Sequence, residues 1–157
     1  MAITPRLIGN IDGKSNSVTM ELPVASAVTV TAGDFVYFAS GRITSATVLG
    51  ARLIGQVQST ATGNAGGTVK ALVVVDPQAK YLVDNDNVGT TYAASHVGQY
   101  VDIAGATGAQ LLDTSSVSTT TGQFIYLEYN PNISPVASDV SWAVVKIAEH
   151  AFSPLGS

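Results

Sequence analysis

The chain contains no cysteine among its 157 residues. This absence excludes disulfide bonds, thiolate metal sites and a cysteine nucleophile, so the fold must be stable without covalent cross-links. Charged residues are also scarce, at 11% against about 25% in an average soluble domain. The seven basic and eleven acidic residues are scattered along the chain, whereas nucleic-acid binding needs clustered Lys and Arg. We therefore expect no nucleic-acid partner, and a charge-poor surface partly covered by copies of the chain or by another protein.

Long hydrophobic runs are missing as well. The N-terminal MAITPRLIGNIDGK lacks the apolar region of about 7 to 15 residues that a secretory signal needs. No apolar run approaches the roughly 20 residues of a membrane helix. We expect a soluble protein that is made in the cytoplasm and has no membrane partner, and its length fits one domain of about 100 to 200 residues.

In place of long hydrophobic runs, the chain contains short apolar segments that are separated by Gly, Asn, Asp, Ser and Thr. Pieces of about four to six residues are too short for ordinary helices and indicate strands. Strands are expected at residues 24–31, 35–39, 42–47, 51–59, 68–76, 81–83, 99–104, 109–114, 123–129 and 141–149. About nine or ten short strands predict an all-β fold, a single-domain antiparallel sandwich or barrel of jelly-roll or β-tulip type.

Local signals refine this prediction. Ser40-Gly41 is expected to form a tight hairpin, and residues 60–67 a loop. At most one short helical turn is expected, at residues 91–98, capped by Thr90 or Thr91 and ended by a left-handed Gly98. Two Ala-Thr-Gly pieces, at 61–63 and 106–108, are loop sequences and indicate no internal repeat.

The first 21 residues do not resemble a core element, because Pro5, Gly9 and Gly13 interrupt isolated apolar side chains. Two interpretations are open: a frayed terminus, or an extended arm that becomes ordered on a neighbouring subunit by adding a strand to a sheet edge. The expected organisation is an N-terminal arm at residues 1–21 and a single β domain at 22–157.

The sequence of residues 84–89, DNDNVG, begins like a calcium loop. Val88 and Ser95 occupy two ligand positions that need oxygen donors, the second a bidentate Glu. Asp and Asn also stabilise turns through their own side chains. We expect an Asx-rich turn and no bound metal or other cofactor.

No catalytic motif stands out, and we expect a protein that is not an enzyme. The chain has no Gly-x-Ser-x-Gly elbow. Asp102, Asp113, Glu128 and Glu149 could converge as a glycosidase pair, although scattered acids do so by chance. Trp142 with nearby tyrosines could form a sugar platform, but a lone Trp on an alternating strand is more often buried. His96 lies between Tyr92 and Tyr100, which suggests an imidazole that is either hydrogen-bonded in the protein or packed at a subunit interface.

Three phrases carry a resemblance to a known family: YLVDNDNVGTTYAASHVGQYVDI, TGAQLLDTSS and TTTGQFIYLEYNP. They are similar to the small decoration, or cement, proteins that stabilise the heads of tailed bacteriophages. The resemblance covers roughly residues 51–150 and weakens toward the N-terminus. It rests on turn and strand phrases and on no catalytic residue.

The resemblance implies a β-rich virion protein that binds the outer surface of a mature capsid as a homotrimer. Its partners would be copies of itself and the major capsid protein, whose neighbouring subunits it holds together. By this resemblance the capsid-contact arm would use Ile3, Arg6, Leu7 and Ile8. The subunit interface would use Tyr92, His96 and Tyr100. The alternative function is a carbohydrate-binding or adhesin-like β domain of a phage fibre or surface appendage.

Overall fold

The chain is all-β, with antiparallel sheets and one 3-10 turn, in the part that the computed structural model describes: residues 5–13, 16–46, 51–129 and 142–151. This architecture confirms the predicted fold class. The elements are β1 (Arg6–Asn10), β2 (Thr19–Pro23), β3 (Thr29–Val30), β4 (Phe35–Ala39), β5 (Arg42–Ser45), β6 (Leu53–Val57), β7 (Ala61–Thr62), β8 (Lys70–Val74), β9 (Ala79–Asp84), η1 (Ala94–His96), β10 (Tyr100–Ala104), β11 (Leu111–Ser118), β12 (Phe124–Glu128) and β13 (Trp142–Ile147).

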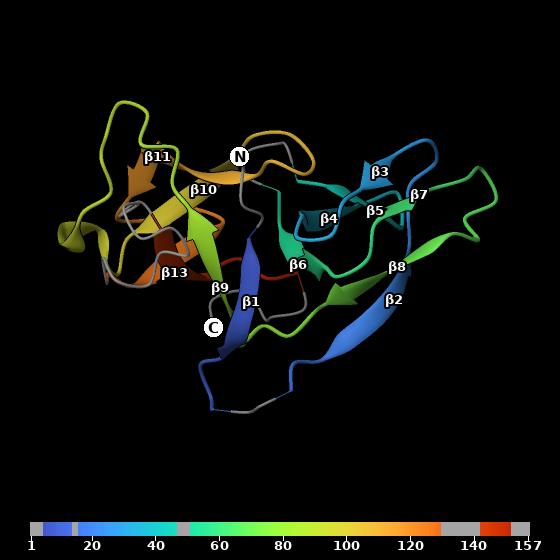
Figure 1. The fold of residues 1–157 in the computed structure, drawn as a ribbon, viewed down its shortest axis with the longest axis horizontal. Helices are drawn as coiled ribbons and strands as arrows, with labels where there is room; N and C mark the ends of the chain where they lie inside the picture. The colour runs from blue at the N-terminus through green and yellow to red at the C-terminus, as the bar shows by residue number, and fades with distance from the viewer. Residues whose placement is uncertain (1–4, 14–15, 47–50, 130–141, 152–157) are drawn as a thin grey trace.

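Ten of these strands form two units that lie side by side (Figure 1), and the two units have the same strand order. The first barrel has the order β2-β8-β6-β4-β5, and the second barrel has the order β9-β13-β12-β10-β11. A parallel bridge curls each sheet toward closure, Val24 to Ile43 in the first barrel and Asn85 to Leu112 in the second. β1 pairs with the outer edge of β9, and β3 and β7 form a separate ribbon.

The strand pairing of the two barrels also matches residue for residue. Directly after the closing bridge, the Ala25 N–H donates to the Ile43 carbonyl as the Asp86 N–H donates to the Leu112 carbonyl, both at 2.9 Å. Equivalent pairs, first barrel before second, are Met20–Val73 and Tyr81–Val145, Leu22–Ala71 and Val83–Ala143, Val36–Gly55 and Val101–Phe124, and Phe38–Ile43 and Ile103–Leu112. The fold is therefore an internal repeat of one five-stranded unit.

Sequence reasoning misses this repeat because strand pairing depends on the backbone, whereas most equivalent side chains differ. The Ala-Thr-Gly pieces do not mark it, since one lies at β7 and the other in the β10–β11 hairpin. Identical residues do occur at some equivalent positions: Val36 and Val101, Ala39 and Ala104, Ala71 and Ala143, and Val73 and Val145.

The two barrels share buried side chains. Phe35 of the first barrel belongs to the same core as the interior of the second barrel. Its ring meets Tyr81 and Phe124 edge-on, with centroids 4.9 and 4.7 Å apart, a favoured aromatic geometry. The interior of the first barrel forms a second core around side chains such as Val36 and Ile43.

Buried polar groups fasten the β10–β11 hairpin to the first barrel. The Gln110 Oε1 accepts a hydrogen bond from the Phe35 N–H at 2.6 Å, and its Nε2 donates to the Phe35 and Ala46 carbonyls. The carboxylate of Asp34 accepts from the Gly108 N–H at 2.7 Å and from the Thr107 hydroxyl. Because these groups are satisfied, burying them costs little and fixes how the barrels meet.

Several local predictions are confirmed. Ser40 and Gly41 have φ of 50° and 76°, as a two-residue hairpin turn requires. The helical turn is η1, followed by Gly98 at φ 84°, although its N-cap is Ala93 and neither threonine. The continuous strand expected at 24–31 is wrong, because Ala27 turns the chain at φ 57° and leaves only Thr29–Val30 as β3. The expected loop at 60–67 contains the short strand β7.

An extended arm or a frayed end was expected in the first 21 residues, but β1 lies within them and β2 begins there. β1 pairs with β9 and β2 pairs with β8, so both belong to sheets of the same chain. The local sequence could not indicate this, because the partner strands are more than forty residues away in the chain.

Candidate binding groove between the barrels

A groove lies between β1 and the outer face of the first barrel. It consists of two adjoining cavities of about 440 and 650 Å³, and both are lined by Leu7 and Gln58. Pro5 and Gln56 line the smaller cavity, and Leu72 lines the larger one. β1 is thus one wall, and the strands of the first barrel supply the opposite wall.

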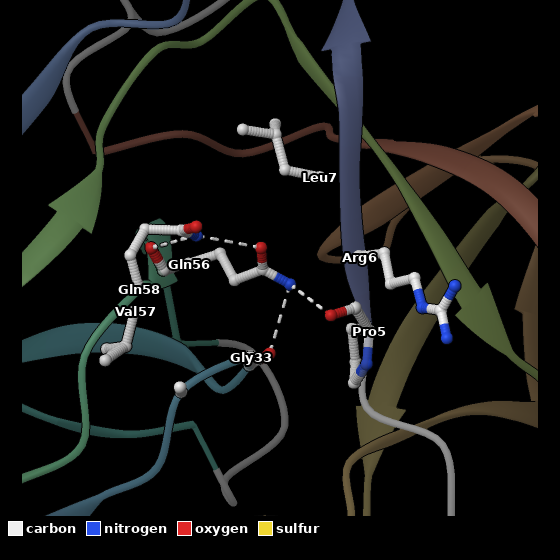
Figure 2. Close-up of a pocket in the computed structure, with 8 residues that line it drawn as sticks. Pro5, Arg6, Leu7, Gly33, Gln56, Val57 and Gln58 are labelled. Atoms are coloured by element: carbon white, nitrogen blue, oxygen red, sulfur yellow. Dashed lines mark hydrogen bonds between the residues drawn. The ribbon is translucent and has the colours of Figure 1, made fainter.

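Gln56 holds the two walls together. Its buried Nε2 donates to the Pro5 carbonyl at 3.0 Å and to the Gly33 carbonyl at 3.1 Å, while its Oε1 accepts from the Gln58 Nε2 at 3.1 Å (Figure 2). In the same view Leu7 points toward Gln58 and Arg6 points to the other side of β1. Leu7 also packs against the shared core, so the end of β1 is fixed by both polar and apolar contacts.

Exposed aliphatic side chains flank this groove. Ile8 and Leu72 line it and are 42% and 39% exposed. Among the described residues that line the groove, Arg6 alone is charged, so the groove is suited to binding an apolar or amide-rich surface.

The structure brings some of the predicted arm residues into this groove. Arg6 is exposed, Leu7 is half-buried and Ile8 is exposed, and all three line one cavity or the other. Ile3 lies outside the described residues. Sequence reasoning missed Gln56 and Gln58, and no local signal could have found them, since the Gln56 contact joins residues 51 positions apart.

Two of the three predicted interface residues lie together on the second barrel. The ring of Tyr92 stacks on Tyr126 at 4.7 Å and lies 6.0 Å from the ring of His96. The Tyr92 hydroxyl donates to the Glu128 carbonyl at 2.9 Å. Burial, with smaller contributions from Tyr129 and Glu128, raises the pKa of Tyr92 to about 12. Tyr92 is therefore largely an internal residue, whereas His96 is half-buried.

Tyr100 lies on β10 and makes no ring contact with this aromatic cluster within the described residues. The His96 Nδ1 accepts a hydrogen bond from the Ala93 N–H at 3.2 Å. The structure thus agrees with the first interpretation of His96, a hydrogen bond within its own chain. The second interpretation, a subunit contact, stays a prediction.

The Asx-rich turn uses its oxygens internally. The Asp86 Oδ1 accepts from the Val88 N–H at 3.1 Å and from the Thr114 hydroxyl at 2.8 Å. The Asn87 Oδ1 accepts from the Tyr92 N–H at 3.0 Å. No cluster of metal-ligating side chains occurs in the part of the chain that the structure describes. These hydrogen bonds account for the Asp and Asn residues as turn formers.

Two of the four acids considered for catalysis lie in one cavity. Asp102 and Glu149 line this cavity of about 250 Å³, which is separate from the groove, and the Asp102 carboxylate accepts from the Gln123 N–H at 3.0 Å. Asp113 accepts from the Ser115 N–H at 3.0 Å. Trp142 is 2% exposed, so its ring is a core group and no face is open to a sugar.

Among the described residues, no helix has the length and apolar character needed to cross a membrane. Comparison with known proteins finds no matching family model, no similar curated protein and no matching solved structure.

Proposed function

We propose that the protein is a structural decoration protein that binds the outer surface of a mature phage capsid as a homotrimer and joins neighbouring capsid subunits. The observation that carries this proposal is the groove between β1 and the first barrel: the exposed aliphatic side chains of Ile8 and Leu72 line it, in a chain of which only 11% is charged. Exposed apolar surface of this kind is typical of protein interaction sites. The similarity of the turn and strand phrases to capsid cement proteins supplies the partner.

A decoration protein of this kind acts by binding and does not need to catalyse a reaction. A protein that binds the expanded shell and not its precursor stabilises that shell by mass action, and many copies add their contributions. The groove lining suits this role, because it presents Leu7, Ile8 and Leu72 with few charges. In this proposal β1 serves as the capsid-contact segment, with its exposed Arg6 and Ile8, and His96 with Tyr100 forms the subunit contact.

The test is co-sedimentation with capsids assembled from the major capsid protein encoded in the same genome, combined with the mass of the free protein by light scattering. We expect a trimer mass and saturable binding to expanded shells. Ile8→Lys and Leu72→Lys should each weaken binding about tenfold, since each introduces a charge that must be desolvated at the contact.

Val88→Lys is the matched control, because Val88 is 64% exposed on the Asx-rich turn, outside the groove lining. It should bind as the unchanged protein does. Equal binding of all three variants, or binding to glycans and not to shells, would favour the carbohydrate-binding alternative or another function.

A further inference from the structure

The repeat shows that one strand edge is covered in the second barrel and open in the first. β1 pairs with the outer edge of β9 at residues Ala79, Lys80, Tyr81 and Leu82. By the matched strand pairing, the equivalent residues at the start of β2 are Val18, Thr19, Met20 and Glu21. Within the described residues no strand pairs with that edge of β2.

Backbone groups of this edge point away from the barrel. The Val18 carbonyl accepts from Val75 and the Val24 N–H donates to Val69, so the even-numbered residues of β2 face β8. Because backbone groups alternate along a strand, the amides of Thr19 and Glu21 face outward. At the equivalent edge of the second barrel, outward groups bond to the β1 segment, as where the Ile11 N–H donates to the Gln78 carbonyl at 2.9 Å.

Side-chain exposure follows the same difference. Val18 and Met20 are 59% and 45% exposed, whereas their equivalents Ala79 and Tyr81 are 1% and 0% exposed. A strand edge with apolar side chains and free amides is a template for another strand. What covers the equivalent edge in this chain is an extended segment of sequence RLIGN.

We propose that the open edge of β2, from Val18 to Glu21, binds an extended segment of a partner protein by antiparallel strand addition. The register of β1 on β9 specifies the chemistry of that segment. Arg6 pairs with Leu82, the equivalent of Glu21, and Leu7 pairs with Tyr81, the equivalent of Met20. The segment therefore carries an Arg or Lys opposite Glu21, where the charges are complementary, followed by an aliphatic residue opposite Met20. This inference rests on the repeat and does not depend on the capsid assignment.

The test uses the full chain and a fluorescent peptide of sequence ITPRLIGNID, residues 3–12 of this protein, as a surrogate for the partner segment. Anisotropy should report saturable binding. Hydrogen exchange of the Thr19 and Glu21 amides, followed by NMR, should slow when the peptide binds, because those amides become donors in a new ladder.

Two variants locate the site. Thr19→Pro removes an outward N–H and should weaken peptide binding about tenfold; its thermal midpoint shows whether the barrel still folds. Glu21→Arg should weaken binding of the original peptide several-fold and improve binding of a peptide in which the arginine is replaced by glutamate. This charge exchange keeps the test decisive if the proline variant fails to fold.

Three results would overturn the proposal. Normal binding to a folded Thr19→Pro variant, with no charge exchange at Glu21, would exclude the edge. Altered exchange at Lys80 and Leu82 in place of Thr19 and Glu21 would show that the peptide replaces β1. Self-association of the chain that Thr19→Pro abolishes would show that a second copy, and not a partner protein, covers the edge.

Discussion

The two barrels have the same strand order and the same pairing, yet they are filled in different ways. At one equivalent position the first barrel has Gly55 and the second has the buried Phe124. In the first barrel Ser40 and Gly41 join β4 to β5, whereas the longer segment 105–110 joins the equivalent strands β10 and β11 of the second barrel. The backbone pattern is therefore common to both, and the side chains and loops decide what each barrel contacts.

These differences have consequences at the junction of the barrels. The longer hairpin of the second barrel reaches the first and inserts Gln110 beside Phe35. The glycine of the first barrel lets β6 approach β8 closely. The second barrel thus supplies the Gln110 clamp, which is the hydrogen bonds from the Gln110 amide to Phe35 and Ala46, and the first barrel supplies the backbone groups that it binds.

Substitution of Gly55 should have the largest effect on this arrangement. A Cβ at this position would lie 1.6 Å from the Val74 carbonyl oxygen, and Gly55 has φ of 151°. Gly55→Ala must therefore displace β8 or break the ladder, and we expect a loss of about 2 to 4 kcal/mol in the free energy of unfolding. Urea denaturation followed by circular dichroism measures it.

Gly66→Ala is the matched control, because among the described residues a Cβ at Gly66 would meet only the Thr68 methyl within 4 Å, at 3.8 Å. It should change the free energy of unfolding by less than about 0.5 kcal/mol. Equal costs for the two variants would show that the close approach of β6 and β8 does not constrain the first barrel.

Removal of the Gln110 amide should cause the next largest loss of stability. The same variant tests whether the two barrels unfold together. Gln110→Leu leaves the Phe35 N–H and the Ala46 carbonyl buried without a partner. The expected cost is about 2 to 3 kcal/mol. Fluorescence of Trp142, the single tryptophan, reports on the second barrel, whereas circular dichroism reports on both.

In the unchanged protein we expect the two signals to give one coincident transition, since the barrels share a core. In Gln110→Leu the transitions should separate. Gln99→Leu is the control, because the Gln99 side chain is half-buried and donates to the Ser95 carbonyl. Coincident transitions at an unchanged midpoint in Gln110→Leu would mean that the clamp does not couple the barrels.

Local chemistry explains which features could be predicted. Ser40-Gly41 and Gly98 need only their neighbours to adopt their turns, and the alternating strands of the second barrel can be read from short windows. Gln56 and Gln110 could not be assigned, because their partners lie 51 and 75 residues away. The same limit hides the groove, since each of its walls is ordinary when considered alone.

Protonation of His150 at low pH should cause a smaller loss in the free energy of unfolding than these substitutions. His150 follows β13 and bridges to Leu53 of the first barrel, so it joins the two units. Burial lowers the pKa of His150 to about 4, with a hydrogen bond to the Ile54 backbone acting in the opposite direction. In the unfolded chain the pKa is about 6.5.

Because the unfolded chain binds this proton more tightly, stability is full above pH 6.5 and falls as the pH drops toward 4. We expect a loss of about 2 kcal/mol over this range, measured by urea denaturation at a series of pH values. His150→Gln should flatten that part of the profile, whereas His96→Gln should leave it in place. An unchanged slope in His150→Gln would assign the acid response to other groups.

Removal of the Tyr92 hydroxyl should have the smallest effect, and it separates two roles of the aromatic cluster. Tyr92→Phe keeps the ring on Tyr126 and deletes the hydrogen bond to the Glu128 carbonyl. The expected cost is about 1 kcal/mol in the free energy of unfolding, with the mass of the proposed trimer unchanged, because the hydroxyl contacts only its own barrel among the described residues. His96→Glu instead changes the half-buried ring beside it and should lower the mass if the proposed subunit contact exists. If Tyr92→Phe altered the mass and His96→Glu did not, the subunit contact would involve the tyrosine hydroxyl, and the division between internal and interface residues would be reversed.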